Sequence, residues 1–197
     1  MTIPALEKKI AATGLTYGRR RDVSYRAGLV AQVLGAALLA VLYPLENPFY
    51  TAGIMLFEAG VLLSAVSALI SPSWINKAVF VAAVAGISFQ AAGFYAPEEN
   101  AGLIILGGLG LVCAAAAGMA GKEAYYFGYW DGWTLSAIGF PLMVVANLAA
   151  RENRMFNAVG FSALFLLLLS LAGRKLKQPL PSSCPSKTCA PPLQKIS

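Results

Sequence analysis

Six long apolar stretches alternate with short polar segments along this chain of 197 residues. Each stretch is close to the ~20 residues that an α-helix needs to cross a bilayer. Because a backbone in hydrocarbon must satisfy its hydrogen bonds internally, the pattern predicts an all-α, polytopic membrane helix bundle of about six transmembrane helices. We place these helices near residues 25–43, 50–70, 75–95, 101–120, 132–149 and 155–173.

The segments between the stretches have the composition of turns. Proline begins or ends helices because its φ is fixed and its N–H is missing, and prolines mark these segments at Pro44, Pro48, Pro72 and Pro97. We expect the polar residues 1–24 to form a cytoplasmic N-terminal segment with a short interfacial helix. Residues 25–173 then form one transmembrane domain. Residues 174–197 are basic and rich in Pro and Ser, which predicts a disordered tail.

Composition supports a membrane location. The chain has 58% hydrophobic and 12% charged residues and a mean hydropathy of +0.66, whereas soluble domains carry roughly 25% charged residues. The net charge of +6 does not indicate nucleic-acid binding, because the basic residues gather at the two ends of the chain. That placement is typical of membrane topology. We therefore expect the lipid bilayer, and no nucleic acid, as a partner.

The distribution of Lys and Arg predicts the orientation of the chain. Thirteen of the fifteen fall on one side of the membrane if both termini lie there. Only Arg151 and Arg154 fall on the other side, where Glu46, Glu98 and Glu99 are also placed. The positive-inside bias then puts both termini on the cytoplasmic side, or on the equivalent stromal side.

The residue inventory argues against catalysis. The chain has no histidine, the commonest metal ligand and general base, and its three cysteines cannot supply the four ligands of a structural zinc site. No phosphate-binding loop, dinucleotide fingerprint or metalloprotease motif is present. We expect no enzyme activity, catalytic residue, cofactor or metal. Cys184 and Cys189, in "CPSKTC", leave open a small disulfide loop or a soft-metal pair, although a reducing cytoplasm favours free thiols.

Glu58 is the only acidic or basic residue well inside a predicted span. Charge is expensive to bury in lipid, so an intramembrane carboxyl is a candidate functional group. One interpretation makes Glu58 a proton or cation site with Gln90 as its partner. The other makes it a protonated or hydrogen-bonded carboxyl without a further role. Gln32 and Asn147 are further polar residues within the spans.

The stretch "GKEAYYFGYWDGW", residues 121–133, lies between the fourth and fifth predicted spans. Tyr and Trp favour the membrane interface, where an apolar ring meets acyl chains and its polar tip meets water. A recognition patch is the alternative, because in a helix Glu123, Phe127 and Asp131 would share one face beside Lys122. The predicted interfacial anchors are Tyr125, Tyr126, Tyr129, Trp130 and Trp133.

Small residues are frequent in the spans, and the fourth contains Gly107, Gly110 and Gly118 beside a run of alanines. Small side chains let helix backbones approach each other in lipid, so we interpret these glycines as helix-packing positions.

Three motifs, in their order and spacing, resemble one family: "DVSYRAGL" at 22–29, "GKEAYYF" at 121–127 and "RKLKQPLP" at 174–181. Over roughly residues 16–181 the chain is similar to an uncharacterised integral membrane protein family of cyanobacteria and plastids (domain of unknown function, number 2301). The resemblance implies a multi-span protein of a cyanobacterial plasma or thylakoid membrane, and it supplies no activity, cofactor or catalytic residue. The residues it singles out are Tyr25, Arg26, Lys122, Glu123, Gln178, Pro179 and Pro181.

The chain departs from the family pattern at two places. Tyr126 stands where a cysteine is expected, and "SSCPSKTC" follows "QPLP" where an acidic stretch is expected. The other matched residues share one side of the membrane in the predicted topology, which suggests a docking patch of Tyr25, Arg26, Lys122, Glu123 and Asp131.

The leading hypothesis is a non-enzymatic scaffold, assembly factor or accessory subunit of a larger membrane complex. The alternative is a small-solute, ion or proton transporter or channel centred on Glu58.

Overall fold

The computed structural model describes residues 19–68, 70, 73–149 and 154–178. Most of the predicted N-terminal segment and nearly all of the predicted tail lie outside this part of the chain. The same holds for the side chain of Asn147 and for Pro179, Pro181, Cys184 and Cys189.

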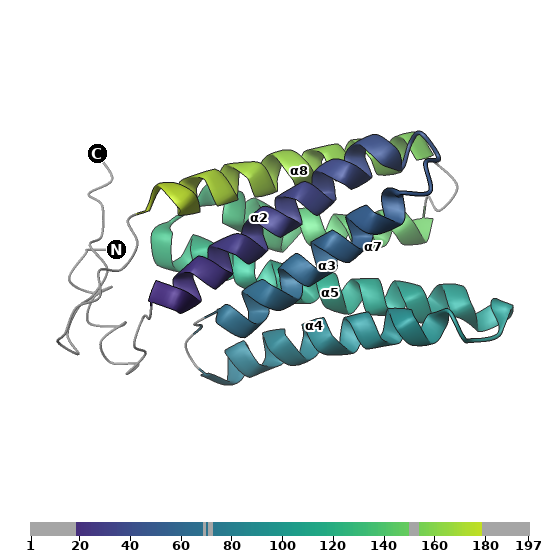
Figure 1. Ribbon diagram of the computed structural model, residues 1–197, viewed down its shortest axis with the longest axis horizontal. Coiled ribbons are helices and arrows are strands. Elements are labelled where there is room, and N and C mark those ends of the chain that lie inside the picture. Colours follow the sequence, from purple (N-terminus) through teal and green to yellow (C-terminus); the bar gives the residue numbers. More distant parts are fainter. Residues whose placement is uncertain (1–18, 69, 71–72, 150–153, 179–197) are drawn as a thin grey trace.

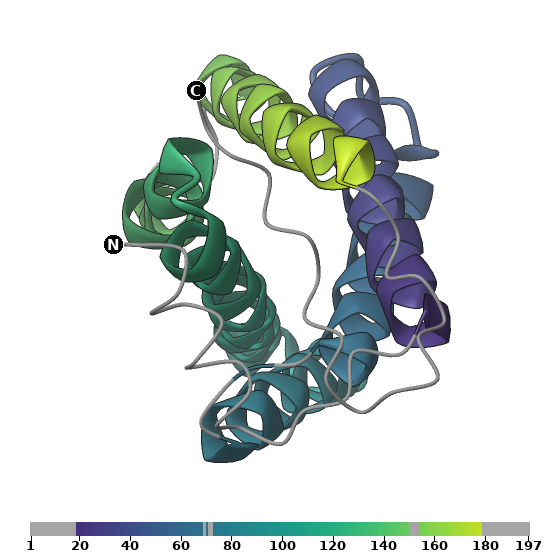
Figure 2. The ribbon, with the colours of Figure 1, turned by 90° about the vertical axis from the view of Figure 1, so that its left-hand side faces the viewer.

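Every regular element in the described residues is helical, which confirms the all-α prediction. The elements are α2 (Arg19–Leu42), α3 (Tyr50–Ser67), α4 (Ser73–Gly93), α5 (Glu98–Phe127), α6 (Trp130–Thr134), the π-helical turn η1 (Leu135–Gly139), α7 (Phe140–Ala149) and α8 (Arg154–Lys177). The long helices lie side by side along the long axis of the molecule (Figure 1). Seen end-on, they form a ring in the order α2, α3, α4, α5, α7 and α8, which closes where α8 packs against α2 (Figure 2).

Five helices are long and apolar enough to cross a membrane: α2, α3, α4, α5 and α8. The fifth predicted span, 132–149, is helical throughout but is divided among α6, η1 and α7, so it is not among those five. Pro141 explains the division, because it lacks the N–H that would bond to the carbonyl four residues back. The π-helical turn comes directly before it, and there the Phe140 N–H bonds to the oxygen of Leu135, five residues back.

Glycines bring neighbouring helices into close contact. In the α2–α3 pair, a Cβ atom built on Gly60 would lie 2.6 Å from the backbone nitrogen of Gln32 and 2.7 Å from the oxygen of Gly28. In the α4–α5 pair, a Cβ atom on Gly86 would lie 2.7 Å from the oxygen of Gly108. Small residues permit this approach between helices in lipid, where no hydrophobic contrast drives association.

The glycines that the sequence suggested for packing behave differently from one another. A Cβ atom on Gly118 would meet a methyl group of Val79 at 2.8 Å, so this glycine does lie at a tight contact. A Cβ atom on Gly110 would lie 3.9 Å from a methyl group of Val144 on α7, an ordinary van der Waals contact between helices, whereas Gly107 faces open space. The prediction was therefore wrong for Gly107, and the tight position against α4 is the adjacent Gly108.

Three helices extend beyond the apolar runs that predicted them, and one of them is α8, which continues to Lys177. α2 begins at Arg19, and α5 continues to Phe127, where Gly128 ends it with a φ of 71°. The 30 residues of α5 correspond to about 45 Å, more than the ~30 Å of the hydrocarbon core. Its last turns therefore reach the level of the headgroups, where charged side chains are tolerated.

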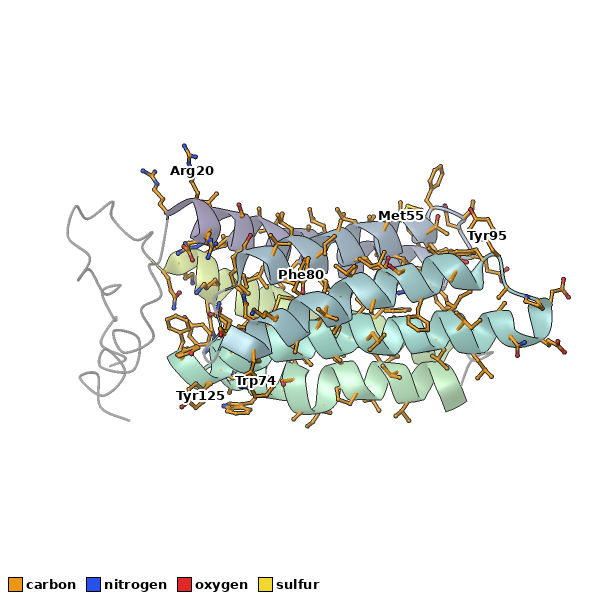
Figure 3. The ribbon with its side chains drawn as sticks, turned by 90° about the horizontal axis from the view of Figure 1, so that it is seen from below. Arg20, Met55, Trp74, Phe80, Tyr95 and Tyr125 are labelled. Atoms are coloured by element: carbon orange, nitrogen blue, oxygen red, sulfur yellow. The ribbon has the colours of Figure 1, made fainter. Side chains whose placement is uncertain are left out.

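The two ends of the bundle differ in exposed charge. We call the end that holds the first turns of α2 and the last turns of α8 the terminal end; there Arg19, Arg20, Arg21 and Lys177 are exposed, whereas Glu46, Glu98 and Glu99 are exposed at the opposite end. Aromatic side chains are exposed at both ends, with Trp74 and Tyr125 at the terminal end and Tyr95 at the other (Figure 3). Two aromatic belts at the ends of an apolar bundle are typical of a membrane-spanning protein.

Candidate functional site

A cluster of charged side chains is buried at the terminal end of the bundle. Its members come from three separate parts of the chain, which α2, α5, α6 and α8 bring together. Six of them are almost completely shielded from solvent: Asp22, Arg26, Lys122, Glu123, Asp131 and Lys175. We call these six residues the terminal cluster.

Glu123 lies at the centre of the terminal cluster and has no exposed surface. Its Oε1 is 3.2 Å from Lys122 Nζ, and its Oε2 is 3.1 Å from Lys175 Nζ. Both ammonium groups also face aromatic rings: Lys122 Nζ lies 4.1 Å from the ring centre of Tyr25, and Lys175 Nζ lies 4.3 Å from that of Phe127. Cation–π contacts of this kind gain strength away from water. The carboxylate and the rings together replace the water that the two lysines lose.

Arg26 joins the first turns of α2 to the end of α8. Its guanidinium pairs with Asp22 at 2.7 Å, one helical turn earlier. It also donates hydrogen bonds to the backbone oxygens of Leu176 and Gln178, at 3.3 and 2.8 Å. The last carbonyls of a helix have no partner within it, so this arginine satisfies the C-terminus of α8. The first turns of α2 and the end of α8 are thereby fixed to each other.

Asp131 joins α6 to α8. One carboxylate oxygen accepts a hydrogen bond from the Ser170 hydroxyl at 2.7 Å and lies 3.4 Å from Arg174 Nε, while the other accepts from the Gly132 N–H at 3.1 Å. Nearby, the Gln178 amide donates to the Tyr129 hydroxyl at 2.7 Å. Burial and, after it, the Glu123 carboxylate raise the pKa of Tyr129 above its ordinary value of 10.0, so the phenol stays protonated at neutral pH.

The buried charges of the terminal cluster balance. Asp22, Glu123 and Asp131 oppose Arg26, Lys122 and Lys175. Burying ions costs several kcal/mol of hydration for each, by order of magnitude, and paired geometry with hydrogen bonds offsets this cost. Within the described residues, no group of three or more His, Cys, Asp or Glu side chains is arranged to hold a metal ion. Ion pairs and hydrogen bonds of the cluster thus join α2, α5, α6 and α8 at one end of the bundle.

The structure differs from the predicted docking patch. It does bring Tyr25, Arg26, Lys122, Glu123 and Asp131 together, but it buries all five side chains. They do not form an exposed surface for another protein. The prediction was based on the predicted topology, which places these residues on one side of the membrane. Topology does not show whether a side chain points into the bundle or away from it.

The predicted interfacial anchors divide into two groups. Tyr125, Trp130 and Trp133 are exposed at the terminal end, as anchors must be. Tyr126 and Tyr129 are half-buried; Tyr126 packs edge-on against Tyr125, and the Tyr129 ring stacks with Phe127 at 5.7 Å. The stretch 121–131 is not one helix, because the chain leaves the helical path at Gly128 and Tyr129. Glu123 and Asp131 meet the same cluster from two different helices.

Glu58 lies near the middle of α3, between α4 and α5. Gln90 of α4 is close to its carboxyl group, and Cys113 of α5 is near enough to feel its charge. Glu58 Oε1 and Gln90 Nε2 are buried and have no hydrogen-bond partner in the part of the chain that the structure describes. Gln32 is different, since its amide donates to the Gly60 oxygen and to Ser64 Oγ, at 3.3 and 3.0 Å. The Gln32 side chain therefore has hydrogen-bond partners on α3, whereas Oε1 of Glu58 has none among the described residues.

Sequence reasoning missed Asp22, Ser170, Arg174 and Lys175. The spacing of Asp22 and Arg26, four residues apart on one helix, is a signal that indicates an ion pair. Arg174 and Lys175 stood in a basic segment that topology alone explained. Nothing in the sequence shows that Lys175 points inward and reaches Glu123.

No family model, no curated protein and no solved structure matched the chain. The resemblance to the membrane protein family of cyanobacteria and plastids therefore stays a prediction from its three motifs. The chain has the fold of an apolar helix bundle that fits an integral membrane protein.

Proposed function

We propose that this chain is an integral membrane protein that carries a proton or a small cation across the bilayer, with Glu58 as the binding group. The proposal rests on the position of Glu58 in the middle of an apolar helix, beside Gln90 and without a cationic partner among the described residues. Intramembrane carboxyl groups are rare and commonly lie on ion or proton pathways.

The terminal cluster supports the same proposal. Its ion pairs join α8 to α5 and α6, and the hydrogen bonds of Arg26 join α2 to the end of α8. Glu58 lies beyond these contacts, toward the middle of the bundle. Transporters expose a central site to one side at a time, which requires one end to be closed. Ion pairs between helices suit this role because they have discrete made and broken arrangements. In this proposal the terminal end is the closed end.

The test is ion flux in vesicles. The purified chain is placed in liposomes with a pH-sensitive dye inside, and a gradient of protons, Na⁺ or K⁺ is applied across the membrane. We expect flux with the wild type, loss of flux with Glu58→Gln and partial recovery with Glu58→Asp. Glu98→Gln, which removes an exposed carboxylate at the end of the bundle, is the matched control. A wild type without flux for any of these ions overturns the proposal.

An accessory or scaffold subunit is the second candidate, and the surface of α4 favours it. Only Val79, Ala83, Gly86 and Gly93 of this helix are buried. Its exposed side chains include Phe80 at mid-helix, which Figure 3 labels, and Phe89. A partner helix would cover that face within a complex. Mild solubilisation followed by a native gel tests this candidate: migration in a large complex supports it, and migration as a single species opposes it.

The orientation belongs to the same proposal. We place both termini on the cytoplasmic or stromal side and count α6, η1 and α7 together as a sixth span. The exposed arginines of the terminal end support this assignment under the positive-inside bias. A cyanobacterial plasma or thylakoid membrane is supported by the family resemblance. The proposal includes no catalysed reaction and no cofactor.

A further inference from the structure

The exposed charge of the terminal end is positive because its acids are buried. Among the described residues at that end, Asp22, Glu123 and Asp131 all lie inside, paired with cations. The cations left at the surface include Arg19, Arg20, Arg21, Arg174 and Lys177. No exposed carboxylate of the described chain offsets them there, so this surface attracts anions.

One corner of this surface combines cations with indole rings. Arg174 and Lys177 lie three residues apart on α8, and Trp130 and Trp133 lie three residues apart on α6, so each pair shares one helical face. The two helices meet where Asp131 contacts Arg174 and Ser170. The guanidinium carbon of Arg174 is 6.0 Å from the ring centre of Trp130. We call Trp130, Trp133, Arg174 and Lys177 the indole–arginine corner.

Arg174 has hydrogen-bonding capacity that the protein does not use. Its side chain is 42% exposed, and only its Nε reaches an acid among the described residues. A guanidinium has five N–H donors in a fork that fits two oxygens of a phosphate group. Its remaining donors are therefore available to a ligand outside the bundle.

We propose that the indole–arginine corner binds the phosphate group of an anionic lipid. Trp130 and Trp133 are exposed, and Trp side chains favour the membrane interface, where indole N–H groups meet headgroups. They therefore place the indole–arginine corner at the level of the headgroups. Further along α8, Leu166 and Leu169 are exposed and offer an apolar strip to the acyl chains. A free phosphate ion uses the cations but gains nothing from the strip or from the indoles. This inference does not depend on ion transport.

The experiment compares phosphatidylglycerol with phosphatidylcholine. The full chain is titrated with each lipid in detergent, and bound lipids are counted by native mass spectrometry. We expect phosphatidylglycerol to bind about tenfold more tightly, because its headgroup has a net negative charge that Arg174 and Lys177 attract, whereas the choline cation of phosphatidylcholine cancels the charge of its phosphate. Equal binding of the two lipids overturns the proposal. Displacement of the lipid by millimolar inorganic phosphate also overturns it, since that identifies a small-anion site.

Three variants locate the site. Lys177→Gln, outside the terminal cluster, is expected to weaken phosphatidylglycerol binding about fivefold. Arg174→Lys keeps the positive charge but removes the forked donors of the guanidinium. We expect this variant to weaken phosphatidylglycerol binding and to leave the fold intact. Lys77→Gln, an exposed lysine at the same end on α4, removes the same charge at a distance and is expected to change binding little. If Lys77→Gln weakens phosphatidylglycerol binding as much as Lys177→Gln does, general surface charge binds the lipid and the proposed site at the indole–arginine corner is wrong.

Discussion

At the residue scale, Glu123 decides whether the terminal cluster is stable. Its carboxylate contacts two lysines on opposite sides and has no exposed surface. We predict that Glu123→Gln lowers the free energy of unfolding by about 3–5 kcal/mol, because it leaves two buried ammonium groups without a counter-charge. Chemical denaturation in detergent, followed by circular dichroism, measures the change.

Glu99→Gln is the control for that measurement, because Glu99 is exposed at the opposite end. Its expected effect is within about 0.5 kcal/mol of zero. If the two variants unfold alike, Lys122 and Lys175 find other partners or water, and the ion pairs with Glu123 do not hold the helices together.

Glu58 supports a second prediction at this scale. Charge is expensive to bury at that depth of the bilayer, so the prediction to test is a neutral carboxyl group at Glu58. Apolar carbodiimides enter the bilayer and couple to protonated carboxyl groups. We expect dicyclohexylcarbodiimide to modify the chain at Glu58 in membranes at pH 7, as read by peptide mass spectrometry, and the modified chain to lose ion flux.

The comparison with other carboxyl groups of the chain makes the labelling decisive. Glu98 is exposed at the end of the bundle, outside the apolar region in which this reagent concentrates, so we expect it to remain unmodified. Labelling of Glu98 and Glu58 to the same extent would show that the apolar reagent does not select Glu58, contrary to the prediction.

At the element scale, the α2–α3 pair depends on Gly60. A Cβ atom there would lie within 2.7 Å of two backbone atoms of α2, which cannot move aside as a flexible side chain does. We predict that Gly60→Ala destabilises the chain by about 1–3 kcal/mol through overpacking. Thermal unfolding in detergent measures this effect.

Gly107→Ala is the matched control on α5. No heavy atom outside its own helix surroundings lies within 4 Å of the added Cβ, so the substitution brings no clash. Ala has a better helix propensity than Gly by about 1 kcal/mol, so Gly107→Ala is expected to be neutral or slightly stabilising. Destabilisation by both variants in equal measure would assign the effect to glycine flexibility instead of helix contact.

The helices themselves could be predicted from the sequence, but their ends could not. Apolar length identifies α3 and α4 closely, because their ends coincide with Pro48, Pro72 and Gly93. It stops α5 too early, since charged Lys122 and Glu123 suggest a loop where ion pairs in fact continue the helix. The division of 130–149 into α and π segments was also not predicted, although Pro141 was the available signal.

At the scale of the whole molecule, the candidate site depends on contacts that the sequence does not contain. Residues 22–26, 122–131 and 170–178 meet only because α8 closes the ring beside α2. Charge counting placed these segments correctly at one end, but it could not separate Arg20, which is exposed, from Arg26, which is buried. The partners of a charge in a helix bundle follow from helix rotation, and neighbouring residues on one helix point in different directions.

The topology of the whole molecule gives the last prediction. Three exposed residues can report the topology: Arg20, Tyr95 and Lys177. Helices α2, α3 and α4 separate Arg20 from Tyr95, and α5, α6, α7 and α8 separate Tyr95 from Lys177. In a chain with Cys184 and Cys189 replaced by Ser, we introduce Arg20→Cys, Tyr95→Cys or Lys177→Cys and treat intact cells with an impermeant maleimide. We expect only Tyr95→Cys to react, and all three to react after permeabilisation. Buried Cys113 is expected to stay unlabelled in both conditions. Labelling of Lys177→Cys together with Tyr95→Cys in intact cells would show an even number of crossings between them, so that α5 and α8 cross the bilayer and the segment from α6 to α7 does not. Labelling of Arg20→Cys and Lys177→Cys without Tyr95→Cys would reverse the orientation and place the cationic terminal end outside.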